Sequence, residues 1–164
     1  VLATHSDEAR AILEDADDDE RAMLGAFPYS RNSAVLHTDT RMMPRTRRAW
    51  ASWNYHLSPS SETESAVTYD MNMLQSLRAD RTYLVTLNRS GAIAPDAVIE
   101  AMEYCHPHFT PAGVEMQTAQ DRLNGRRRTY FCGAYWRYGF HEDGVISALN
   151  VCRKFGLTLE DVGA

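Results

Sequence analysis

The middle of the chain is rich in β-branched and aromatic residues, which are gathered in short runs. These runs cover residues 34–39, 49–55, 65–69 and 82–88. Residue types that favour turns separate them, so the pattern predicts an antiparallel sheet. Residues 70–77 have apolar side chains at helical spacing and predict a short helix between two of the strands.

Much of the remaining sequence shows helical periodicity. Helices are predicted within residues 5–13, 15–24, 96–104, 112–123 and 144–155. Ser6 is placed to cap the first of them. The acidic residues 15–20 lack the central glycine and the distal glutamate of a calcium-binding EF-hand loop, so they predict a solvated helix start. The predicted fold class is α+β, an antiparallel or mixed sheet with flanking helices.

The first four residues, Val1–Thr4, are typical of the end of a buried strand, although no initiator methionine or turn precedes them. A strand needs a neighbouring strand to pair its backbone N–H and C=O groups. We therefore expect the natural protein to continue upstream of Val1 and this chain to be a fragment.

Composition narrows the possible partners and compartments. Aspartate and glutamate number 22 against 17 lysines and arginines, and this net charge of −5 disfavours a nucleic-acid partner. No stretch approaches the roughly 18 consecutive apolar residues of a membrane span. The three cysteines form no Cys-x-x-Cys pair, which predicts buried thiols in a reducing compartment, and we expect the cytoplasm.

The last third of the chain carries the candidate chemistry. Residues 128–135 predict a strand that ends at Gly133, and an aromatic loop then leads to a helix that begins near Glu142 and Asp143. Such a junction offers free backbone N–H groups and the positive end of the helix dipole. The acids beside these amides disfavour bare phosphate and favour a ligand with hydroxyls and a carbonyl. A flavin, with its ribityl chain and isoalloxazine ring, meets both demands.

Several segments also resemble a known family. Residues 128–133 and 139–145 resemble the C-terminal FAD-binding segment of flavin-containing amine oxidases. A wider similarity, to a bacterial branch of that superfamily described as predicted NAD/FAD-binding proteins, is carried by residues 1–7, 35–39, 49–55, 68–75 and 133–144. Glu142 and Gly139 match the family motif, whereas Asp143 and Gly144 stand where the family has glycine and alanine.

The resemblance implies a two-domain FAD-dependent oxidoreductase that passes a hydride from a carbon of a small-molecule substrate to noncovalent FAD. Its N-terminal dinucleotide-binding domain would lie upstream of Val1. Residues 1–24 would leave that FAD domain, residues 25–127 would belong to the substrate domain, and residues 128–164 would return to the FAD domain. The implied cofactor-binding residues are Gly133, Ala134, Gly139, Glu142, Asp143, Gly144 and Val145, and the implied flavin- or substrate-facing aromatics are Trp136, Tyr138 and Phe140. Amines and apolar polyenes stay open as substrates.

Two other classes stay open beside the flavoprotein. His106 and His108, together with His37 or His141, could form the metal site of a hydrolase. Alternatively, Trp50, Trp53 and Tyr55 could cover a partner in a non-catalytic interaction domain. An exposed sheet edge could also make the isolated chain self-associate.

Overall fold

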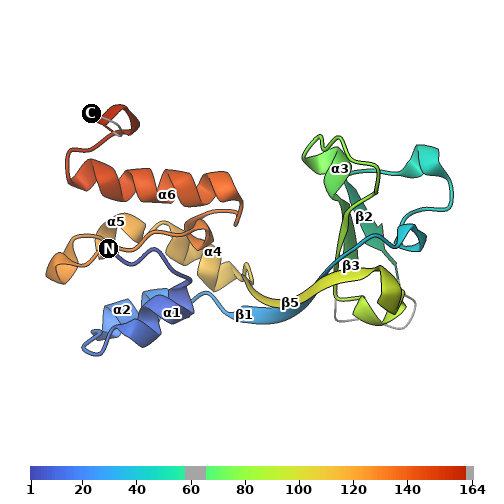
Figure 1. Ribbon diagram of the computed structural model, residues 1–164. Helices are drawn as coiled ribbons and strands as arrows, with labels where there is room; N and C mark the ends of the chain where they lie inside the picture. The colour runs from blue at the N-terminus through green and yellow to red at the C-terminus, as the bar shows by residue number, and fades with distance from the viewer. Residues whose placement is uncertain (58–65, 162–164) are drawn as a thin grey trace. The chain divides into compact units, whose positions relative to one another are not determined.

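The computed structural model describes residues 1–57 and 66–161, and they form the α+β fold predicted from the sequence. The chain divides into two compact units (Figure 1). Unit 1 comprises residues 1–30 and 107–164, and unit 2 comprises residues 31–106. This division falls at residues 30/31 and 106/107, whereas the segments predicted from the sequence end at residues 24 and 127.

Unit 2 contains an antiparallel sheet with strand order β2-β3-β4-β1-β5. Its strands are β1 (Tyr29–His37), β2 (Trp53–His56), β3 (Ala66–Asp70), β4 (Leu84–Leu87) and β5 (Val98–Pro107). The four strands that the β-rich runs predict are confirmed. The short helix predicted after β3 is also present as α3 (Met71–Leu74), and the Asp70 side chain caps it by accepting from the Met73 N–H.

The two faces of this sheet differ in burial. One cross-strand row lies on the buried face and consists of Asn54, Thr68, Thr86 and Val35. On the opposite face, Trp53 and Tyr55 retain 57% and 59% of their surface exposed. Trp53 packs edge-on against Tyr69 of the neighbouring strand, with ring centroids 5.6 Å apart. The face outside the core of unit 2 is therefore partly aromatic.

The helix predicted for residues 96–104 is wrong, because these residues lie mostly in the strand β5. Only Pro95–Ala97 makes a 3₁₀ turn, with Pro95 in its first position. Beyond it, the chain lies beside β1 in the sheet, starting near a hydrogen bond from the Thr38 N–H to the Ala97 C=O at 3.0 Å. The apolar spacing of this segment fits a helix, but the backbone pairing offered by β1 overrides it.

Unit 1 holds the other α-helices, α1 (Ser6–Ile12), α2 (Asp18–Gly25), α4 (Pro111–Gln117), α5 (Gln120–Leu123) and α6 (His141–Lys154). No helix of the described residues is long and apolar enough to cross a membrane. Short 3₁₀ turns complete the chain: η1 (Thr40–Met42), η2 (Arg47–Ala49), η3 (Ser90–Ala92), η4 (Pro95–Ala97), η5 (Arg126–Arg128), η6 (Ala134–Trp136) and η7 (Leu159–Asp161).

Two details of these helices differ from prediction. The helix expected over residues 112–123 is broken into α4 and α5, because the Thr118 hydroxyl donates to the Glu115 C=O and closes the last turn of α4. Ser6 does not cap α1. His5 occupies the cap position instead, while Ser6 is buried and donates its N–H to the Tyr29 hydroxyl at 3.0 Å.

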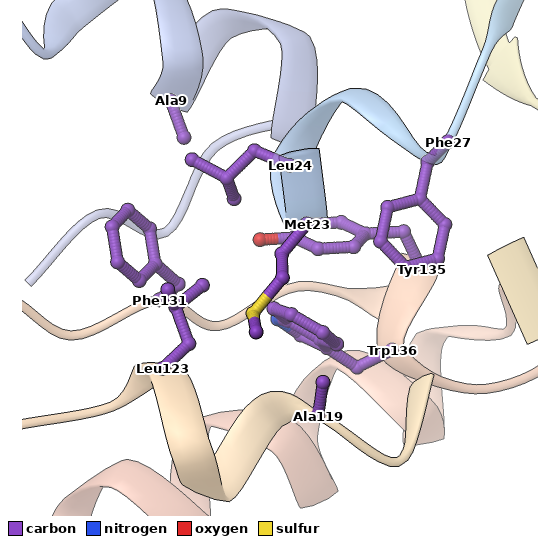
Figure 2. Packing of buried hydrophobic residues seen from close by; sticks show 9 residues of the cluster. All are labelled: Ala9, Met23, Leu24, Phe27, Ala119, Leu123, Phe131, Tyr135 and Trp136. Atoms are coloured by element: carbon purple, nitrogen blue, oxygen red, sulfur yellow. The ribbon is translucent and has the colours of Figure 1, made fainter. Parts of the chain in front are cut away.

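The core of unit 1 joins its two sequence segments. Nine buried side chains form it, as Figure 2 shows: Ala9, Met23, Leu24, Phe27, Ala119, Leu123, Phe131, Tyr135 and Trp136. The Phe27 ring meets the Tyr135 ring at 5.1 Å and the Trp136 ring at 5.5 Å between centroids. Aromatic contacts therefore connect the end of α2 with η6.

The acidic run at residues 15–20 pairs with two arginines of unit 1. Arg126 Nη2 lies 3.0 Å from Asp17 Oδ2, and Arg127 Nη1 lies 3.3 Å from the buried Glu20 Oε2. Asp17 also caps α2, as the predicted helix start requires, by accepting from the Glu20 N–H at 2.8 Å. Two charged clusters of the sequence thus face each other.

Candidate functional site

The first residues of the chain meet residues 130–132 through a single parallel bridge, where the sequence predicts longer strands. The Leu2 N–H donates to the Tyr130 C=O at 2.8 Å, and the Cys132 N–H donates to the Leu2 C=O at 3.0 Å. A parallel bridge between Leu2 and Phe131 results. The strand end at Val1–Thr4 therefore finds a neighbour about 130 positions away, and unit 2 lies between them in the sequence.

Gly133 follows this strand at a position with no room for a side chain. A Cβ atom there would lie 2.7 Å from the Tyr135 Cδ1 and 3.3 Å from the Thr4 carbonyl oxygen. Its N–H donates to the Ser147 hydroxyl at 3.0 Å. Glycine is required here because a Cβ would overlap the buried Tyr135 ring.

The first turn of α6 separates the two neighbouring acids. Asp143 is buried, accepts from the Phe140 N–H at 3.0 Å and pairs with Arg137, whose Nε lies 3.4 Å from Oδ1. Glu142 is exposed, and its carboxylate forms no hydrogen bond with the described residues. The backbone N–H groups of His141 and Glu142 also donate to no acceptor among those residues. Asp143 is thus a helix cap, while Glu142 and two amides face solvent.

The remaining predicted site residues lie in or near this junction. Gly139 has φ = +88°, which favours glycine, and a Cβ there would lie 3.1 Å from the Phe109 ring. A Cβ at Gly144 would lie 4.0 Å from the Ala134 N and Cβ atoms. Val145, on the next position of α6, is 46% exposed.

The three aromatic residues of the loop have different environments. Trp136 belongs to the core and is 2% exposed, whereas Tyr138 and Phe140 are 72% and 59% exposed. Two buried polar atoms, the Tyr135 hydroxyl and the Trp136 indole Nε1, have no hydrogen-bond partner in the described part of the chain. Burial, with the nearby Tyr29, raises the pKa of Tyr135. Of the three, only Tyr138 and Phe140 therefore have solvent-exposed rings that a ligand could contact.

Three polar side chains that the sequence reasoning missed hold the strand in place. Asn124 Oδ1 accepts from the Phe131 N–H at 2.6 Å, and its Nδ2 donates to the Phe131 C=O at 3.2 Å. Gln120 Nε2 donates to the Ser147 Oγ at 2.8 Å. Polar side chains among apolar positions of the predicted helices are the signal that could have indicated them.

The histidines form no metal centre. Among residues 1–57 and 66–161, no group of three or more His, Cys, Asp and Glu side chains is placed to hold a metal ion. His106 Nδ1 instead contacts the Asn32 amide nitrogen at 3.1 Å. His106, His108 and His141 are therefore not brought together as the hydrolase alternative requires.

The cysteines depart partly from prediction. Cys132 is buried and Cys152 is half-buried, but Cys105 is exposed on β5, where its side chain lies outside any core. Burial raises the pKa of the Cys132 thiol. All three are free thiols.

Neither a protein-family model nor a curated protein matches this chain.

Proposed function

We propose that the chain is the C-terminal part of an FAD-dependent oxidoreductase of the amine-oxidase type. The observation that carries the proposal is the parallel pairing of residues 1–4 with residues 130–132, followed by Gly133 and the open start of α6. A substrate-domain sheet inserted between two strands of an FAD domain would have this order along the chain. The dinucleotide-binding domain that completes the pair would be a separate, upstream part of the intact protein.

The junction at α6 fits one edge of a flavin. The free N–H groups of His141 and Glu142 suit a carbonyl that gains negative charge, and the dipole of the 14-residue helix reinforces them. The exposed Glu142 carboxylate can accept from a ribityl hydroxyl. Because the Asp143 side chain is turned back onto the Phe140 N–H, it does not block this edge. When bound, FAD supplies a hydride acceptor.

The exposed aromatic face of unit 2 supports the substrate-domain assignment. Trp53 and Tyr55 offer apolar surface for a small-molecule substrate, either an amine or an apolar polyene, in a cytoplasmic enzyme. The same face favours a second candidate, a non-catalytic interaction domain or self-association of the isolated chain, because exposed aromatic side chains also mark interfaces.

Gly144→Val tests the flavin edge in the intact protein. A Cβ at position 144 fits beside Ala134, but the valine methyl groups would occupy space at the first turn of α6 that the proposed flavin edge needs, so FAD affinity is expected to fall at least roughly tenfold. FAD titration of the apoprotein, followed by flavin fluorescence, measures it.

Gly91→Val is the matched control, because a Cβ at Gly91 has nothing within 4 Å and the residue lies in unit 2. Equal FAD affinity for the Gly144 and Gly91 variants, with both melting as wild type, contradicts the flavin assignment.

A further inference from the structure

Unit 2 contains a second candidate site, formed by residues other than those of the proposed flavin edge. It is a cavity of about 420 Å³ between β2 and the segments around residues 41–44 and 89–92. Its polar lining includes Arg41, Asn54, Tyr55, His56 and Arg89, and Met42 and Met43 contribute apolar wall. A volume of this size lies in the range typical of small-molecule sites.

The charge of the lining points to an anion. It contains two arginines and no aspartate or glutamate, although the chain as a whole is acidic. Arg41 is already engaged, because its Nε and Nη2 donate to Asp39 at 2.8 and 2.6 Å. Arg89 forms no ion pair with any residue in the described ranges. Arg89 is therefore the cation that a ligand can meet.

A chain of hydrogen bonds runs across the buried sheet face to this cavity. His37 Nε2 lies 2.7 Å from Thr86 Oγ1. The Thr86 Oγ1 lies 2.8 Å from Thr68 Oγ1, and the Thr68 Oγ1 lies 2.7 Å from His56 Nε2. His37, Thr68 and Thr86 are completely buried. Such a chain of buried hydroxyls and imidazoles fixes the positions of its members.

The hydrogen bond to His37 fixes the donor-to-acceptor direction of this series of hydrogen bonds. The Asp39 N–H donates to His37 Nδ1 at 3.1 Å, so the proton of the neutral His37 ring is on Nε2 and is donated to Thr86. Thr86 can then donate to Thr68, and Thr68 to His56 Nε2. His56 therefore carries its proton on Nδ1, which donates to no acceptor within residues 1–57 and 66–161.

The charge state of both rings agrees with this order. Burial lowers the pKa of His37, and the nearby Asp39 carboxylate opposes that shift. Burial also lowers the pKa of His56, and the positive charge of Arg89 lowers it further. Both imidazoles are therefore neutral at pH 7, and His56 has one N–H to offer.

We propose that this cavity binds a small organic carboxylate, which accepts from the His56 Nδ1–H and pairs with the Arg89 guanidinium. The methionines of the wall suit an apolar tail on that ligand. A monoanion matches the Arg89 guanidinium and the neutral His56 donor better than a phosphate dianion does. Thr68, Thr86 and His37 are positioning residues that select the His56 tautomer. The site lies wholly within unit 2 and does not depend on the flavin proposal.

Titration of the 164-residue chain with hexanoate, followed by calorimetry, tests the ligand class. Hexanoate is expected to bind at least about tenfold more tightly than hexanamide or inorganic phosphate. Arg89→Gln should weaken hexanoate binding by at least about tenfold, while Arg78→Gln, at an exposed arginine outside the lining, should leave it unchanged. Absent hexanoate binding, equal binding of hexanamide, tighter binding of phosphate, or unchanged binding by the Arg89 variant overturns the proposal.

Nitrogen-15 NMR of the histidine rings tests the hydrogen-bond chain separately. In the wild type the neutral His56 ring should carry its proton on Nδ1. Thr86→Val removes the linking hydroxyl, so His56 should become a mixture of tautomers and hexanoate binding should weaken several-fold. Thr86→Ser should restore both properties. A wild-type His56 ring protonated on Nε2, or the same Nδ1 tautomer in folded Thr86→Val, contradicts the chain.

Discussion

Replacing Phe131 with alanine is expected to destabilise unit 1 by about 3–5 kcal/mol, the range typical of a fully buried phenylalanine. The Phe131 side chain has no exposed surface and lies in the core with Leu24 and Leu123 (Figure 2). Its backbone also pairs with Leu2 and with the Asn124 side chain. The substitution therefore leaves a cavity beside the bridge between Leu2 and Phe131.

Urea denaturation followed by helical circular dichroism measures this effect, since unit 1 holds the longer helices. Phe140→Ala is the matched control. Because Phe140 is 59% exposed, this substitution should lower the free energy of unfolding by less than about 1 kcal/mol. Similar losses for the two variants contradict the proposed core.

Glu142→Ala is expected to lower the FAD affinity of the intact protein roughly ten- to a hundredfold. The reason is the loss of one charge-assisted hydrogen bond, which contributes about 1.5–3 kcal/mol. The melting temperature of the apoprotein should hardly change, because the Glu142 carboxylate is exposed and forms no hydrogen bond with the described residues.

The adjacent acid provides a contrast for this experiment. Asp143→Ala removes the acceptor of the Phe140 N–H and the partner of Arg137, so it should lower the melting temperature. Parallel FAD titration and thermal unfolding separate the two roles. A Glu142 variant that melts early but binds FAD normally identifies Glu142 as a structural residue.

Strands were predictable where local composition and tertiary pairing agree. In β1–β4 the β-branched and aromatic residues occupy paired positions of one sheet, so their pattern directly predicts the strands. In β5 the spacing of Ile99 and Met102 suits a helix, and only the neighbouring β1 decides for a strand. That partner is about 65 positions away and cannot be seen in a local window.

The candidate sites were predictable only in part. Gly133 and the start of α6 follow from the strand–glycine–helix order, but the different environments of Glu142 and Asp143 depend on the position of Arg137. The hydrogen-bond chain of unit 2 was missed because its members come from four strands. His37 and Thr86, for example, are 49 positions apart. Register across a sheet, rather than motif spacing, creates such a chain.

The flavin content of the intact protein tests the central claim most directly. If the proposal holds, the intact protein, denatured to release its cofactor for chromatography, should yield about one FAD per chain, because the proposed dinucleotide-binding domain would supply the pyrophosphate contacts. Residues 1–164 alone should bind FAD weakly or not at all. An intact protein without flavin that also fails to take up added FAD contradicts the account, as does a sub-micromolar FAD complex of residues 1–164.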